Sequence, residues 1–261
     1  MTERSTIEAA LIRDRWLVGG ALAVAIGLSW GWIVPMALDM YGDMSGSAAW
    51  MMAAHWSARH DLLLLAMWVV MMCGMMLPST APTLLIYAAV VRRSGDGAPT
   101  ALRVYSFAAG YVAVWTAFSL LATIAQRWLA DRLLLSPMME LTSPVLGGAL
   151  LVAAGLYQLT SFKQSCLQSC QSPASFIATH WRPGRAGAWR MGLEHGLYCL
   201  GCCWVLMLLL FVGGVMNLLW IAAITVFVLA EKLAPRFAQG GRLSGILLIV
   251  AGLAFALREF R

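Results

Sequence analysis

The chain has 261 residues, of which 61% are hydrophobic and only 11% are charged, and its formal net charge is +6. A soluble domain carries about 25% charged residues, so this composition excludes an ordinary soluble fold and predicts an integral membrane protein. The positive charge does not require nucleic acid as a partner, because basic loops of a membrane protein face anionic lipid head groups.

Seven apolar segments have about the 20 residues that a helix needs to cross a bilayer. We therefore expect an all-α, polytopic membrane helical bundle of about seven transmembrane helices, forming a single integral membrane domain over residues 1–261. Pro78 and Pro82 lie inside the second segment and predict a kink or break there. The seven expected spans are Trp16–Leu38, Leu62–Val91, Val104–Gln126, Ser143–Phe162, Met191–Gly213, Met216–Leu233 and Leu243–Leu257.

The basic residues predict how these spans are oriented. With the amino terminus in the cytoplasm, thirteen of the 18 Lys and Arg residues fall on the inner side and five on the outer side. This is the bias that the positive-inside rule describes, so we expect a cytoplasmic amino terminus.

The loop after the first span, residues 39–61, mixes methionine and histidine. It holds His55 and His60 as well as Met40, Met44, Met51 and Met52. On the outer face, such a loop suits the capture or release of copper. An interfacial segment, with Trp50 and Trp56 dipping into the head groups, explains it equally well.

Methionines crowd the second span just before Pro78. Met67, Met71 and Met75 follow an i, i+4, i+8 stripe, and Met72 and Met76 form a pair on another face. Thioethers bind Cu(I) and hold Zn(II) or Mg(II) poorly. The stripes therefore favour a Cu(I) site, although methionine is also an ordinary gap-filling residue.

Cys166 and Cys170 fall in the expected cytoplasmic loop between spans four and five. A disulfide is not expected in that compartment. A pair of thiols four residues apart, with His180 following, can accept or donate a soft metal ion. It can equally be a packing pair at a helix end.

The fifth span carries the densest chemistry. His195, Cys199 and Cys202 share one stripe of a helix, with Cys203 at its edge. Glu194 points away by about 100°. Thiols and ionisable groups inside a membrane are functional candidates by default, and Cys, His and Met are ligands for soft metals. The alternative is that each cysteine is a small packing residue.

At the end of span six, we expect Lys232 to snorkel to the interface, and Glu231 to share a polar pocket with Glu194 and His195. A carboxylate there would orient His195 for metal binding. Alternatively, Glu194 pairs with Lys232 or Arg190.

We expect spans two and five to face a common cavity. The residues predicted to contribute to a metal site are His195, Cys199, Cys202, Cys203, Met71, Met72, Met75, Met76, Glu194, Glu231, Cys166 and Cys170.

Four stretches, residues 67–79, 157–170, 190–204 and 228–232, together resemble a bacterial family of predicted metal-binding integral membrane proteins. This family is related to the membrane copper-delivery proteins encoded beside bacterial tyrosinases. The resemblance implies a multi-pass protein of the bacterial cytoplasmic (inner) membrane that binds Cu(I) and delivers it to a copper-dependent enzyme. It assigns no roles to individual residues.

Several functions remain open on the sequence. A copper chaperone is the leading interpretation, and a copper transporter uses the same ligands. No ATPase phosphorylation motif or nucleotide-binding loop is present, and we do not expect an enzyme. The alternative class is a membrane thiol–disulfide oxidoreductase that uses the Cys199-Leu-Gly-Cys202 motif. A haem-binding anchor is a third, less favoured reading.

Overall fold

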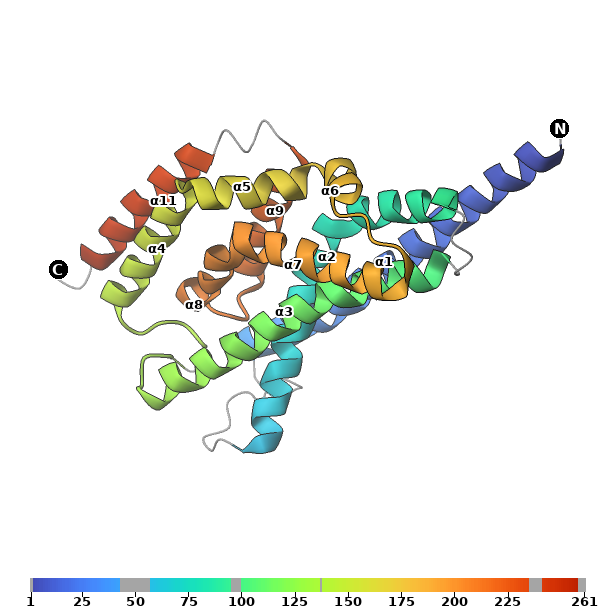
Figure 1. The fold of residues 1–261 in the computed structure, drawn as a ribbon. Helices are drawn as coiled ribbons and strands as arrows, with labels where there is room; N and C mark the ends of the chain where they lie inside the picture. Colours follow the sequence, from blue (N-terminus) through green and yellow to red (C-terminus); the bar gives the residue numbers. More distant parts are fainter. Residues whose placement is uncertain (1, 43–56, 95–99, 137, 235–240, 258–261) are drawn as a thin grey trace.

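The computed structural model describes residues 2–42, 57–94, 100–136, 138–234 and 241–257, which are organised as helices and short connections (Figure 1). The all-α prediction is therefore confirmed for these residues. The helices are α1 (Thr2–Tyr41), α2 (Ala58–Ser94), α3 (Thr100–Asp131), α4 (Pro144–Gln158), α5 (Ser161–Gln171), α6 (Pro173–Thr179), α7 (Gly184–Leu208), α8 (Leu210–Gly213), α9 (Leu218–Leu233) and α11 (Gly241–Ala256).

Four stretches within the described part of the chain are helical, long and apolar enough to cross a membrane. They are Trp16–Tyr41, Ala58–Arg93, Thr100–Asp131 and Gly184–Gly213. The helices α4 and α5 would add a fifth if they formed one span, but they meet at a bend of 66°. The helices α9 and α11 have only 16 residues each. The count of seven and the cytoplasmic amino terminus are thus not confirmed.

The centre of the fold is the crossing of α3 and α7, which Figure 1 shows at the middle of the molecule. The two backbones approach closely because glycines line the crossing. A Cβ atom at Gly110 would meet the backbone of Trp189, and one at Gly192 would meet the backbone of Phe107. Small residues at helix crossings give this kind of close packing in membrane bundles. The crossing brings Tyr111 of α3 next to the cysteines of α7.

We expect Gly192→Ala to destabilise the protein by about 1–3 kcal/mol, because the added methyl group overpacks a backbone contact. Gly27→Ala is the matched control, since a Cβ at Gly27 of α1 meets no atom within 4 Å. Thermal unfolding of both variants in the same detergent measures the difference. Equal melting temperatures for the two variants would contradict the close approach.

The second helix is continuous through Pro78 and Pro82, and Figure 1 shows that α2 bends along its length, so of the predicted kink or break the helix has a bend and no break. Pro78 has no N–H, so the carbonyl of Gly74 loses its helical partner. The indole Nε1 of Trp30 in α1 donates to that carbonyl at 3.2 Å. The carbonyl of Met76 accepts from Ser79 Oγ at 2.8 Å and from the Tyr111 hydroxyl at 3.2 Å.

The expected loop after span four is instead a helix. Thr160 caps α5, with its side chain accepting from the backbone N–H of Lys163. Cys166, Leu167 and Cys170 are buried along α5, which packs against α7. Both cysteines do lie between the expected spans four and five, and the segment that holds them is helical. Their spacing places them on the inner face of a short helix that turns back over the bundle.

Candidate functional site

Three thiols from two helices gather around the Cys199 thiol. Cys202 and Cys203 donate to the carbonyl of Cys199 at 3.1 and 3.0 Å. The Cys170 thiol of α5 lies within side-chain hydrogen-bonding range of both Cys199 and Cys202. All four side chains are at most 8% exposed, and all six cysteines of the chain are free. We call Cys170, Cys199, Cys202 and Cys203 the thiol cluster.

Polar groups from two other helices, α3 and α9, contact Cys199 as well. The Tyr111 hydroxyl lies 3.0 Å from its Sγ atom, and the Lys232 Nζ atom lies 2.8 Å from the same atom. Lys232 also donates to Ser79 Oγ at 3.2 Å. Lys232 is only 5% exposed, so the prediction that it snorkels to the interface is wrong. A buried ammonium group needs partners, and here it finds them inside the bundle.

The predicted methionines of α2 all face the core. Met71, Met72, Met75 and Met76 are at most 1% exposed, so none of them faces lipid. The Sδ atom of Met76 lies 4.0 Å from the Sγ atom of Cys203. This contact joins the Met72/Met76 face of α2 to Cys203 at the edge of the α7 stripe, whereas α3 is the helix that packs extensively against both α2 and α7, so the common cavity expected between spans two and five stays a prediction.

His195 lies four residues before Cys199 and is 3% exposed. Its ring is surrounded by Phe107, Tyr111 and Phe176, with ring centroids 5.0 to 6.0 Å away. Within the described part of the chain, its Nδ1 atom has no hydrogen-bond partner. The predicted carboxylate that would hold this imidazole is not there.

Both predicted carboxylates belong to ion pairs elsewhere. Glu194 pairs with Arg182 at 2.6 Å on a half-exposed face, because it projects about 100° away from the stripe of His195. Glu231 pairs with Lys163 of α5 at 2.7 Å in a fully buried position. The prediction of a pocket shared by Glu194, Glu231 and His195 is wrong, and so is the pairing of Glu194 with Lys232 or Arg190.

The remaining predicted residues lie beside the cluster, away from it or outside the described part of the chain. Cys166 packs against Gly201 of α7 and lies near Cys202 of the cluster. His180 stacks on Phe176 and interacts with Thr179 rather than with cysteine. Met40 and His60 are buried, and the rest of the expected outer loop, with His55, Met44, Met51 and Met52, lies outside the described residues.

Sequence reasoning missed Tyr111 and Ser79 and misplaced Lys232. A lysine next to a glutamate inside an apolar run was the one available signal, because a charge at that depth requires partners. Nothing in the local sequence marks Tyr111, whose position depends on the crossing of α3 and α7.

The thiol cluster suits a soft ion better than a hard one. Among the residues with described positions, no three or more Cys, His, Asp or Glu side chains are arranged so that they could together hold a metal ion, and this includes the four thiols of the cluster. Zn(II) requires such a set of four ligands. Cu(I) accepts fewer ligands and takes thioethers as well as thiolates, so two cysteines and Met76 offer a compatible donor set.

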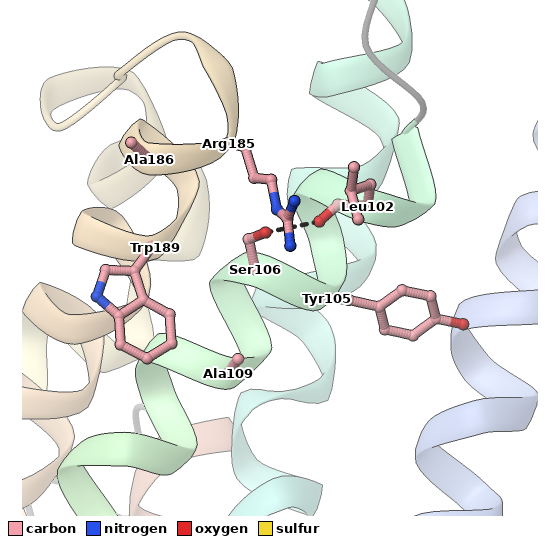
Figure 2. Close-up of a pocket in the computed structure, with 7 residues that line it drawn as sticks. All are labelled: Leu102, Tyr105, Ser106, Ala109, Arg185, Ala186 and Trp189. Atoms are coloured by element: carbon pink, nitrogen blue, oxygen red, sulfur yellow. Dashed lines mark hydrogen bonds between the residues drawn. The ribbon is translucent and has the colours of Figure 1, made fainter.

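An open surface pocket of about 690 Å³ lies between α3 and the first turns of α7. Figure 2 shows Arg185 reaching over Ser106, with Tyr105 and Trp189 on either side. None of the predicted metal-site residues lines this pocket. It is therefore separate from the buried thiol cluster.

Comparison with known proteins agrees with this chemistry. No curated protein and no solved structure matches the chain significantly. The model of a protein family described as PpoB2, copper chaperone, matches residues 65–255, which include most of α2, all of α3 to α9 and nearly all of α11. This match covers well over half of the chain and contains every residue of the thiol cluster. The chain therefore belongs to the PpoB2 copper chaperone family.

Proposed function

We propose that the protein binds Cu(I) at the thiol cluster and delivers it to a copper-dependent enzyme at the bacterial cytoplasmic membrane. The observation that carries this proposal is the convergence of four buried thiols from α5 and α7 with the Met76 thioether. Membership of a copper chaperone family supports the copper cargo. Four long apolar helices support a membrane location.

The proposed ligands are Cys199, Cys203 and Met76. Cys199 is the centre of the cluster, and Cys203 joins it to the thioether. Cys170 and Cys202 lie close enough to exchange with these ligands during transfer. Glu194 and Glu231 are not proposed as ligands, because each is already committed to an ion pair.

The site already accommodates positive charge. The Lys232 ammonium group lies 2.8 Å from the Cys199 sulfur, and the Tyr111 hydroxyl lies on the same atom. A monovalent metal ion that displaced the ammonium group from this sulfur would leave the local charge unchanged. A divalent ion would add further charge in a region with little water, where uncompensated charge is expensive. This contrast favours Cu(I) over Zn(II).

We expect the purified, reduced protein to bind Cu(I) stoichiometrically and in preference to Zn(II). The physical reason is the excess of sulfur donors over free carboxylates around Cys199. Elemental analysis after loading with each metal, followed by competition with a chromophoric Cu(I) chelator, measures this preference. Stoichiometric zinc without copper uptake would overturn the proposal.

One observation favours the alternative of a thiol–disulfide oxidoreductase. The Cys199 thiol lies within range of both Cys170 and Cys202, so a disulfide could form with small movements. Mass spectrometry of the protein after mild oxidation, with and without bound Cu(I), separates the two functions. Rapid formation of one specific disulfide that a partner thiol reverses would support the oxidoreductase, and slow or scrambled oxidation would support the metal site.

A further inference from the structure

Soft side chains continue along α7 beyond the thiol cluster. Met191, His195, Cys199, Cys203 and Met207 follow one another at steps of four residues, and all are at most 3% exposed. Met207 therefore lies one turn beyond Cys203, and Met191 lies two turns before Cys199. The cluster is the middle of a longer series of buried sulfur and imidazole groups.

The register between α2 and α7 extends this series on one side. Met76 contacts Cys203 at 4.0 Å, and Trp68 contacts Phe211 with ring centroids 5.4 Å apart. Trp68 lies eight residues before Met76 on α2, and Phe211 lies eight residues after Cys203, just beyond the end of α7 in α8. The two segments therefore run antiparallel. Met72 of α2 therefore lies level with Met207, midway between these two contacts, and both are fully buried.

Methionines of α1 continue in the same direction. Gly74 of α2 packs against Ser29 and Ile33 of α1, and Figure 1 shows that these two helices run in opposite directions. Met36 and Met40, which follow Ile33 on α1, therefore lie toward the end of the bundle where α2 begins. Met67 and Met71 of α2 lie toward that same end, and all four are buried.

Packing alone does not explain this distribution. The described part of the chain contains twelve methionines, and eleven of them are buried. Methionine is a flexible filler that specifies a core less well than leucine or isoleucine does, so cores normally use it sparingly. Here seven of the eleven buried methionines belong to α1 and α2.

We propose that Met76, Met72, Met207, Met71 and Met67 form a thioether ladder along which Cu(I) reaches and leaves the thiol cluster. This inference rests on the proposed Cu(I) function. From Met67 to Met76 the ladder rises about 14 Å, at 1.5 Å per residue. It leads from the end of the bundle where α1 ends and α2 begins down to Cys203.

Each step along the ladder is a ligand exchange. A copper–sulfur bond to the next thioether forms before the bond to the previous sulfur breaks, and the oxidation state of copper stays the same. Thioethers are neutral and bind Cu(I) more weakly than thiolates do. They therefore stabilise the ion in transit without trapping it, and the thiol cluster remains the resting site.

The test compares rate with affinity in the full chain embedded in lipid nanodiscs. The protein is loaded with one equivalent of Cu(I), and a water-soluble Cu(I) chelator then removes it while absorbance reports the rate. The double variant Met72→Leu/Met207→Leu keeps the apolar volume but removes two sulfur atoms from the ladder. We expect removal to slow by about tenfold or more, equivalent to a barrier higher by about 1.4 kcal/mol, while the equilibrium affinity changes by less than about threefold.

Met191→Leu is the matched control. Met191 is equally buried and lies on α7, but on the opposite side of the thiol cluster from the ladder. Its rate of copper removal should equal that of the natural protein. An unchanged rate in the double variant, or slower removal in Met191→Leu instead, overturns the ladder. Failure of the proposed function looks different, because then the natural protein itself binds no Cu(I).

Discussion

Replacing Lys163 with Met should lower the free energy of unfolding by about 3–5 kcal/mol, because it leaves the Glu231 carboxylate buried without a cation. The Lys163 Nζ atom lies 2.8 and 2.7 Å from the two carboxylate oxygens of Glu231. The side chains of the pair are 0% and 3% exposed. Lys163 also donates to Gln158, and the Nε2 atom of Gln171 donates to the carbonyl of Glu231. The pair therefore ties α4 and α5 to α9.

Two further variants isolate the cause of this loss. The double variant Lys163→Met/Glu231→Met removes both charges and should recover much of the stability, since no unpaired charge remains. Arg127→Met breaks the exposed pair with Asp61 and should cost less than about 1 kcal/mol. Thermal unfolding in one detergent compares all three variants. If the single and double variants at the buried pair were equally unstable, lost packing rather than unpaired charge would be the cause.

Cys199→Ser should lower the affinity for Cu(I) by at least about hundredfold, equivalent to about 2.7 kcal/mol. Cys199 is the one sulfur that contacts Tyr111 and Lys232 while lying within range of the other thiols of the cluster. A serine hydroxyl preserves size and hydrogen bonding to these neighbours but is a hard ligand that Cu(I) binds poorly. The fold should therefore survive while the metal site is lost.

Cys73→Ser is the matched control for this substitution. Cys73 lies on α2 and is only partly buried, among the methionines but outside the thiol cluster. Competition titrations with a Cu(I) chelator under reducing conditions measure both affinities, and unfolding curves check that both variants fold. An affinity of Cys199→Ser equal to that of Cys73→Ser would remove Cys199 from the ligand set.

The α-helical class and the approximate spans follow from local composition. The expected first and third spans lie inside α1 and α3, because long apolar runs form helices whatever their neighbours are. The soft-metal stripes of α2 and α7 were also predictable, since i, i+4 spacing places side chains on one face regardless of tertiary context. The prediction of a copper-related function was inferred from the methionine, cysteine and histidine residues of these stripes taken together.

Contacts between distant segments were not predictable in this way. Local sequence placed Cys170 in a loop, whereas packing of α5 against α7 brings it to Cys199. Lys232 and Glu231 are adjacent in sequence, yet they face different neighbours, one toward the cluster and the other toward Lys163.

The sequence by itself thus determined a helical chain with long apolar helices and with sulfur side chains in stripes on two of them. Only the tertiary structure decided which of those sulfurs meet, which charges pair, and that His195 lies among aromatic rings without a carboxylate. The physical reason is that helix periodicity sets which residues share a face, whereas the close glycine crossing of α3 and α7 and the 66° bend between α4 and α5 set which faces meet.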